Sequence, residues 1–326
     1  MKFKLINLNL NLNFMEPSPK RRRKDDGEVL RTRRPHKLDA DLIRYFRQLE
    51  VTLVEFEADD ASGDAADRSE MLVHAALREM RNSEASAASH KHCSHVVERL
   101  LTIASGLALR TFMHNAAGFA LHMCTNRYAS HVVQVMLKRA ATLLYAPQQR
   151  LDEAEDAPPP IAELIASFCG EIEQDWATII SDPSGSHTAR SLLDLLSGGG
   201  APTAATPMPI GASAQLGGIV PAICATLLEL GWGTLRKAAS THHSGGAIAL
   251  LVEALSSHQR QLRSLRVNLL SDGTATEGET LVKLASCGSG SRVLESIVRV
   301  SSGKGGCDSE LFEIFAERQG AQKYIV

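Results

Sequence analysis

Internal repetition is the feature of this 326-residue chain that most constrains its fold. Five segments share one pattern: a short polar turn, a small residue, and then an apolar run with helical spacing. Their aligned positions are Ser94, Ser130, Ser186, Gly246 and Ser291, separated by 36, 56, 60 and 45 residues. The pattern of each unit predicts two helices, and a single pair of helices cannot bury its apolar face. The repetition therefore predicts an all-α solenoid of stacked repeats.

Inserts account for the unequal steps between the units. They fall near residues 146–160, 198–218 and 271–279, where Pro, Gly, Ser or acidic residues are concentrated. A small residue precedes four of the aligned positions, namely Ala129, Gly185, Gly245 and Gly290. We expect these small residues to let backbones approach closely. A last helix is expected over residues 309–318.

The chain before the repeats divides into two parts. Residues 1–37 are expected to be a disordered basic tail, with Met1 or Met15 as the start. A cluster in this tail is typical of a nuclear-import signal read by an import receptor; it comprises Lys20, Arg21, Arg22, Arg23 and Lys24. Residues 38–70 are expected to form a capping helix and then an acidic linker, and residues 71–326 the repeats. The helix is amphipathic, with Leu38, Leu42, Tyr45, Phe46 and Leu49 at helical spacing.

Composition narrows the classes of partner. The net charge is only −2, but residues 1–50 hold 13 basic and 7 acidic side chains, and residues 71–149 hold 8 and 3. A nucleic-acid partner for the N-terminal half is therefore compatible with the charge. Aromatic residues are 5% of the chain, too few for rows of aromatic stacking platforms.

The six cysteines form no C-x-x-C pair, which predicts reduced, mostly buried thiols in a cytosolic or nuclear protein. Gly and Pro interrupt the uncharged run 195–228, so no membrane segment is expected.

A polar triplet recurs at the start of four of the predicted second helices. The first, second and fifth residues of each window are Ser94, His95 and Glu98; Ser130, His131 and Gln134; Ser186, His187 and Arg190; and Ser291, Arg292 and Glu295. In a helix the first and fifth residues lie on one face and the second flanks them. Such a set suits a single unstacked RNA base, with two side chains at its edge and one on its flat face. The fourth unit, at Gly246, has no polar side chain at these offsets and is expected to act as a spacer.

These windows resemble the RNA-binding repeats of the Pumilio (PUF) family. The order of features is most similar to the nucleolar Pumilio-like ribosome-biogenesis proteins, as in Cys93-Ser-His-Val-Val-Glu and Gly290-Ser-Arg-Val-Leu-Glu. The resemblance covers about residues 38–318 and implies an armadillo-like solenoid. It also implies a nuclear and nucleolar function on precursor small-subunit (18S) ribosomal RNA, with ribosome-assembly proteins as further partners. Members of this family have about twice as many repeats, so the chain resembles an N-terminal part.

The same residues also fit several other interpretations. Each Ser-His pair also fits a helix N-cap followed by an ordinary histidine. His90, His92, Cys93 and His95 suggest a zinc site, but their spacing matches no usual finger. Gly288-x-Gly290 lacks the third glycine of a dinucleotide site. No catalytic residue, metal or other cofactor is expected, and the alternative function is a helical-repeat scaffold that binds proteins.

Overall fold

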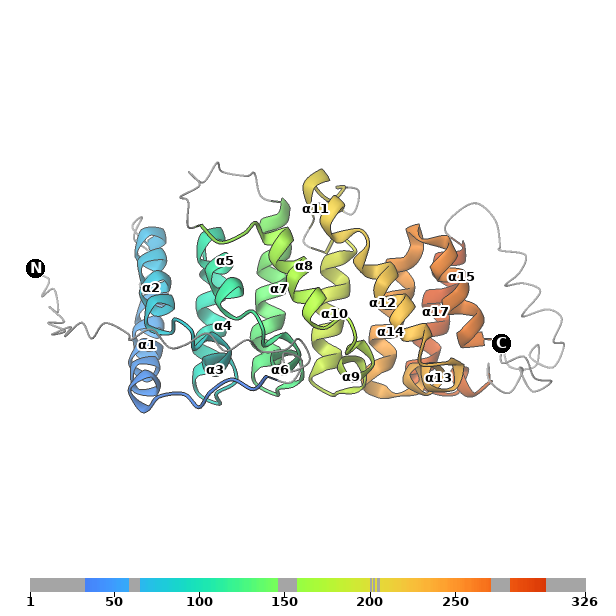
Figure 1. Ribbon diagram of the computed structural model, residues 1–326, viewed down its shortest axis with the longest axis horizontal. Helices are drawn as coiled ribbons and strands as arrows, with labels where there is room; N and C mark the ends of the chain where they lie inside the picture. Colours follow the sequence, from blue (N-terminus) through green and yellow to red (C-terminus); the bar gives the residue numbers. More distant parts are fainter. Residues whose placement is uncertain are drawn as a thin grey trace, which may run out of the picture.

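The helices form a solenoid in which each repeat adds one helix to a continuous row. The computed structural model describes residues 33–58, 65–145, 157–199, 201, 203, 206–270 and 282–302. The row, termed here the ladder helices, consists of α4 (Cys93–Ile103), α7 (Ala129–Tyr145), α10 (Gly185–Leu196), α14 (His242–Ala254) and α17 (Gly288–Ser302). Each ladder helix packs on the next (Figure 1). The described residues contain no strand, and the predicted all-α solenoid is confirmed.

Two further sets of helices complete the repeats. The backing helices are α2 (Ala65–Glu79), α5 (Gly106–Asn115), α8 (Ile161–Glu171), α12 (Ile219–Leu228) and α15 (Gln259–Leu270). The edge helices are shorter and lie along the lower edge in Figure 1; they are α3 (Glu84–Ala88), α6 (Ala120–Thr125), α9 (Trp176–Ser181) and α13 (Trp232–Ser240). Helix α11 (Ile210–Leu216) precedes α12, and the 3-10 turn η2 (Leu255–Ser257) follows α14. Residues 282–285 are also helical and occupy the edge position of the last described repeat.

The units thus have three helices rather than the two that the sequence pattern predicts. Residues 107–123, which the two-helix pattern would place in one helix, are divided into α5 and α6 by a turn in which Gly118 has a φ of +85°. The carboxylate of Glu171, on the next backing helix, accepts hydrogen bonds from the N–H groups of Gly118 (2.8 Å) and Ala120 (3.1 Å). This carboxylate satisfies backbone donors at the start of α6 that have no partner within the helix. The break therefore depends on a residue of the following repeat.

A side-chain acceptor stabilises the turn before each of three ladder helices. Asn126 Oδ1 accepts from the N–H of Ala129 at 3.0 Å, and Asp182 Oδ1 accepts from the N–H of Gly185 at 2.7 Å. Cys287 Sγ occupies the same offset and accepts from the N–H of Gly290 at 3.3 Å. Because the acceptor bonds the N–H three residues ahead, it fixes the direction in which each ladder helix begins.

The small residues at the start of the ladder helices permit a close backbone approach, as predicted. A Cβ atom added to Gly185 would lie 2.5 Å from the carbonyl oxygen of Ile179, and one added to Gly245 would lie 2.6 Å from that of Ala239. At Gly290 the corresponding atom is the carbonyl oxygen of Leu284. In each case the oxygen belongs to the edge segment six residues earlier. The edge helix and the ladder helix of one repeat therefore meet at backbone distance.

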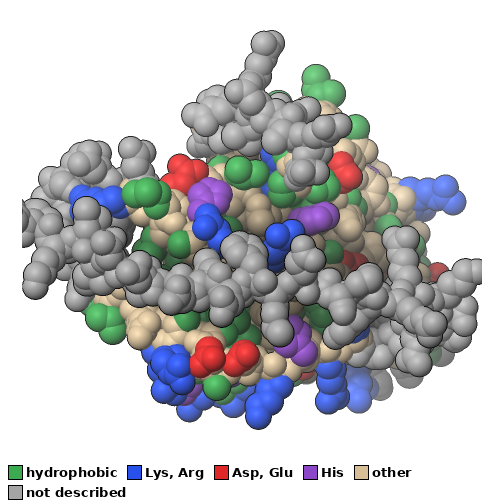
Figure 2. Space-filling view, turned by 60° about the vertical axis from the view of Figure 1, so that its left-hand side comes forward, with side chains coloured by type: hydrophobic (Ala, Val, Ile, Leu, Met, Phe, Trp, Pro, Cys, Tyr) green, Lys and Arg blue, Asp and Glu red, His purple; other side chains and the backbone are tan. Residues whose placement is uncertain are grey.

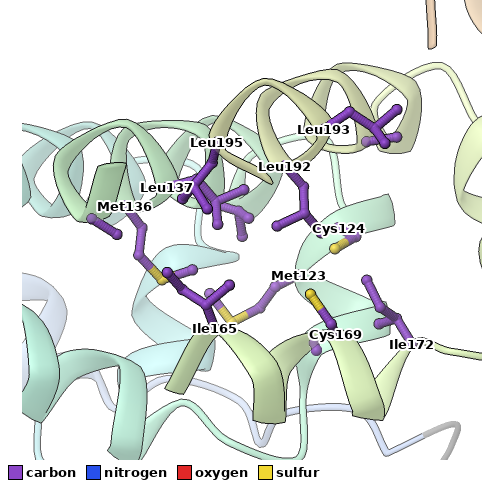
Figure 3. Packing of buried hydrophobic residues seen from close by; sticks show 14 of the residues in the cluster. Met123, Cys124, Met136, Leu137, Ile165, Cys169, Ile172, Leu192, Leu193 and Leu195 are labelled. Carbon is purple, nitrogen blue, oxygen red and sulfur yellow. The ribbon is translucent and has the colours of Figure 1, made fainter. Parts of the chain in front are cut away.

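The core fills the space between the ladder and backing helices. Val96, Val97, Val132, Val133 and Val293 are buried, as their position between the polar residues of each window predicts. Figure 3 shows Leu192, Leu193 and Leu195 of α10 facing side chains of α6, α7 and α8. The apolar layer is therefore continuous from one repeat to the next, as in other repeat arrays.

The described cysteines are free thiols, and four of the five are buried. Burial raises the pKa of Cys93 and of Cys224 to about 11 and that of Cys169 to about 12. It also raises the pKa of Cys124, which faces the same apolar layer (Figure 3). These thiols therefore act as small apolar side chains, as predicted. Cys287 is half-buried, and Cys307 lies outside the described residues.

The N-terminal part packs against the first two repeats. Helix α1 (Ala40–Ala58) buries Phe46, Leu49 and Leu53 and is longer than the sequence pattern predicts. Before it, residues 33–39 run along the lower edge of Figure 1, beneath α3 and α6. The Arg33 guanidinium lies 5.0 Å from the centroid of the Phe119 ring, and His36 Nε2 lies 3.2 Å from Ser83 Oγ. These contacts hold residues 33–39 against the first two repeats.

Parts of the predicted organisation lie outside the described residues. They are the import-type cluster 20–24, both possible start residues, most of the inserts at 146–160 and 271–279, and the helix expected over 309–318. Within the uncharged run, residues 210–228 are long and apolar enough to cross a membrane by length and composition alone. The structure divides them into α11 and α12, which bury Leu216, Ile223 and Leu227.

Glu84, at the start of α3, gives a prediction for the pH dependence of stability. Its side chain is buried and accepts a hydrogen bond from Asn115 Nδ2 at 2.7 Å. Burial raises the pKa of this carboxyl, although hydrogen bonds from Asn115 and nearby backbone oppose the change. A raised pKa means that the folded state binds a proton more tightly than the unfolded chain does. The contribution of Glu84 to the free energy of unfolding therefore falls as pH rises from the pKa that Glu84 has in the unfolded chain through the higher pKa that it has in the folded protein.

Urea unfolding of wild type and Glu84→Gln between pH 4 and pH 8 tests this. The difference in unfolding free energy, variant minus wild type, should increase with pH. Glu173→Gln, which removes an exposed carboxylate after α8, is the matched control. A constant difference for Glu84→Gln across this range would contradict the expectation.

Candidate nucleic-acid interface

The four polar windows all lie in the first two turns of ladder helices. Ser94, Ser130 and Ser186 occupy the second residue of α4, α7 and α10, and Ser291 the fourth residue of α17. Since neighbouring ladder helices pack side by side, windows far apart in sequence become neighbours in space (Figure 1). The fold therefore brings the windows of α4, α7 and α10 into one row, and α14 separates that row from the window of α17.

The second residues of the windows are accessible. His95, His131, His187 and Arg292 are all exposed at equivalent places on their helices. Burial lowers the pKa of His187, and the charges of Arg190, His131 and His243 lower it further. A neutral imidazole presents a flat π-face, and a guanidinium presents a planar cation, so both suit stacking on a base.

The first residues are not accessible in three of the four windows. Ser94, Ser130 and Ser186 have 4%, 2% and 0% of their surface exposed, and Ser186 Oγ donates to the carbonyl oxygen of Pro183 at 3.0 Å. The expectation that these hydroxyls reach a base edge is therefore wrong for the described conformation. Each of these three serines is the second residue of a ladder helix that packs against the edge helix of its own repeat. Ser291 is exposed.

Some of the fifth residues of the windows already form hydrogen bonds or ion pairs within the protein. Gln134 Nε2 donates to the carbonyl oxygen of Ser130 at 3.0 Å, which leaves its amide oxygen and one N–H for a ligand. Glu98 is half-buried. Glu295 is exposed and accepts from Arg299 at 2.5 Å, and Arg299 also bonds Glu253 at 2.9 Å. The fifth positions are therefore polar and reachable, and Glu295 belongs to an ion-pair network.

Three polar groups near the windows were missed by sequence reasoning. His243 is exposed on α14, and its ring lies 5.4 Å from that of His242 in an edge-to-face arrangement. It lies three residues before Gly246, the first residue of the fourth window, so it is not part of any aligned window. The Arg127 guanidinium lies 4.9 Å from the centroid of the Tyr128 ring, two residues before Ser130. Such Arg-aromatic pairs offer planar surfaces to a base.

Charge on the surface also fits an anionic ligand. Figure 2 shows Lys and Arg side chains gathered along the lower edge of one face, with His side chains next to Lys or Arg higher on it.

Among the residues that the structure describes, no group of three or more His, Cys, Asp or Glu side chains is arranged to hold a metal ion. The rings of His90 and His92 lie 5.9 Å apart.

The comparisons with known proteins agree with this arrangement. Residues 82–210 match the model of the NOP9-like PUF repeat domain. These residues are similar to a NOP9-like PUF repeat domain. They contain the windows of α4, α7 and α10. The resemblance to PUF repeats inferred from the windows is thereby confirmed.

Curated proteins similar to this chain are named Nucleolar protein 9. The one from Coccidioides posadasii is 29% identical over 175 residues, which cover 49% of this chain and 23% of the relative. The one from Aspergillus clavatus is 25% identical over 170 residues, covering 49% and 24%. The match to the Talaromyces marneffei protein is longer, 23% identical over 282 residues, covering 73% and 40%. The chain thus aligns with about a quarter of the first two relatives.

Solved structures support the PUF-type fold. The structure of APUM23-GGAAUUGACGG superposes with a TM-score of 0.63 at 21% identity, covering 81% of this chain and 49% of that one. APUM23-GGAGUUGACGG gives a TM-score of 0.65 at 20% identity, covering 85% and 51%. At these identities the likeness establishes the solenoid alone. The superposition covers about half of each of these two solved chains.

Proposed function

We propose that this chain binds single-stranded RNA along its ladder helices. The observation that carries the proposal is the row of exposed planar side chains at one repeated position, His95, His131 and His187 on adjacent helices and Arg292 on α17. A protein-binding scaffold does not need the same side-chain chemistry at one offset in successive repeats. Unstacked bases do, because each needs a flat partner.

In this proposal each second residue stacks on a base, and the fifth residue hydrogen-bonds its edge. Gln134 offers both a donor and an acceptor for such a bond, and Glu98 and Glu295 offer acceptors. Arg190, the fifth residue of the third window, offers donors only, which suit a base edge or a phosphate. Ser291 is the one first-position hydroxyl with surface access. Ser94, Ser130 and Ser186 contribute by packing, since they are buried. Recognition of this kind requires no catalytic residue or cofactor.

The proposed setting is the nucleolus, and the proposed target is precursor small-subunit (18S) ribosomal RNA. The name shared by the curated relatives, Nucleolar protein 9, supports the compartment. The basic cluster 20–24 supports entry into the nucleus through an import receptor. The similarity to a NOP9-like PUF repeat domain supports the proposal of this target RNA and of ribosome-assembly proteins as partners. Sequencing of RNA crosslinked to the chain in cells tests them: reads should concentrate on the 18S precursor, and reads spread over unrelated transcripts would contradict the assignment.

Filter binding with labelled 12-nucleotide single-stranded RNA of random sequence tests the binding function. In moderate salt we expect submicromolar affinity and a clear preference over a duplex of the same length, because bases in a duplex offer no free face. Failure to bind below micromolar concentrations would contradict the proposal and would favour the protein-binding scaffold. Equal affinity for the duplex would show contact through phosphates alone.

A further inference from the structure

The fourth repeat, which has no polar residue in its own window, has a long side chain from the third repeat lying over it. Arg190, the fifth residue of the α10 window, extends toward Gly246, the first residue of the α14 window. A Cβ atom added to Gly246 would lie 3.4 Å from Arg190 Cδ and 3.5 Å from its Nη1. Helices α10 and α14 are neighbours in the ladder (Figure 1). A Cβ at these distances would be in ordinary van der Waals contact with Arg190, so only a side chain larger than that of alanine would enter the space of the guanidinium.

The hydrogen bonds of Arg190 hold the guanidinium in place. Its Nη2 lies 2.6 Å from His187 Nδ1, and its Nε donates to the carbonyl oxygen of Ser186 at 3.3 Å. Since arginine has no acceptor, His187 Nδ1 accepts this bond, and the proton of the neutral ring is on Nε2. A guanidinium has five N–H donors, so these two bonds leave three for a ligand.

Two further histidines lie near the pair formed by Arg190 and His187. His131 on α7 and His243 on α14 both lie near enough to His187 to act on its charge. Within the described part of the chain no carboxylate forms an ion pair with Arg190. Asp194, one turn further along α10, is exposed. A half-buried arginine with free donors and no acidic partner is suited to an anion.

We propose that Arg190, together with His187 and His243, forms a composite site between the third and fourth repeats for one phosphate group of the RNA backbone. The inference deepens the proposed function and rests on it. The fourth repeat is then not a spacer: it supplies Gly246, beside which Arg190 lies, and it supplies His243. Two N–H groups of a guanidinium match two oxygens of a phosphate, and such a contact sets register without reading sequence. A site of this kind would hold the strand in place across a repeat that reads no base.

Fluorescence anisotropy with 12-nucleotide RNAs across a potassium chloride series tests this site. For Arg190→Ala we expect affinity to fall about 5- to 10-fold at low salt, equally for A12, U12 and C12 oligonucleotides. The slope of log affinity against log salt should also decrease by about 0.7, the contribution of one phosphate contact on a single strand. Arg190→Lys should keep the slope because it keeps the charge. Arg260→Ala, which removes an exposed cation from backing helix α15, is the matched control and should leave the slope unchanged.

Gly246→Val provides a second, independent test because it leaves Arg190 in the chain. The added side chain should displace the guanidinium and lower affinity as much as Arg190→Ala, and the double variant should lose no more than either single one. Circular dichroism melting shows whether each variant is folded. An unchanged affinity and slope for folded Arg190→Ala, while His95→Ala/His131→Ala weakens binding, would overturn this site alone. A loss confined to one homopolymer would also overturn it, because the contact would then read a base. Absence of binding by the wild type would overturn both proposals.

Discussion

Replacing His95 and His131 together by alanine is expected to weaken binding of single-stranded RNA by at least roughly 30-fold. Both rings are exposed at the same position of adjacent ladder helices α4 and α7. Stacking on a planar side chain contributes about 1–3 kcal/mol per base, so the loss of two platforms removes about 2 kcal/mol or more. Filter binding with the random 12-nucleotide RNA measures the change.

The matched variant is His95→Tyr/His131→Tyr, which keeps a flat ring at both positions. It should retain most of the affinity if stacking is the contribution of these side chains. Because both positions are exposed, neither pair of substitutions should change the melting temperature substantially. Equal binding by the alanine variant and the wild type would contradict the assignment. If the tyrosine variant lost as much as the alanine variant, the imidazoles would act through hydrogen bonds or charge instead.

Replacing Gly185 by valine is expected to have the largest effect on stability, at least about 3 kcal/mol. The carbonyl oxygen of Ile179 lies 2.5 Å from where the new Cβ would stand. Two backbone segments would have to separate, because the obstructing atom is main chain and has no other rotamer. The edge helix α9 and ladder helix α10 would then lose their contact, and the serine and leucine side chains of α10 would lose their packing.

Gly170 is a suitable comparison because it also lies in a helix, α8, but a Cβ added there meets no atom within 4 Å. Gly170→Ala should stabilise the protein by up to about 1 kcal/mol, since alanine loses less backbone entropy in a helix. Urea unfolding followed by circular dichroism measures both variants. A Gly185→Val protein as stable as the wild type would show that α9 and α10 need not meet at backbone distance.

The repeats and their register were predictable because they depend on local pattern. The alignment of Ser94, Ser130, Ser186, Gly246 and Ser291 places each of them near the start of a ladder helix. The apolar pairs between the polar residues are at helical spacing, and the small residues at the helix starts indicated where backbones meet. These features repeat along the chain, so one unit supports the interpretation of the next.

Features that depend on neighbouring repeats were not predictable from the pattern. The break between α5 and α6 is stabilised by Glu171, which follows Gly118 by more than fifty residues. The burial of Ser94, Ser130 and Ser186 results from packing against edge segments. Likewise, the position of Arg190 over Gly246 crosses from one repeat to the next. An alignment of the windows compares equivalent positions of different repeats, and it contains no information on contacts between neighbouring repeats.

The most direct test of the central claim is to map where RNA touches the protein. Ultraviolet crosslinking of the full chain to 4-thiouridine-containing single-stranded RNA, followed by mass spectrometry of the peptides, gives this map. The account predicts crosslinks on the ladder-helix segments that contain His95, His131 and His187, and fewer of them in the His95→Ala/His131→Ala variant. Crosslinks confined to the basic residues before Leu38, or located on the backing helices α5, α8 and α12, would contradict it.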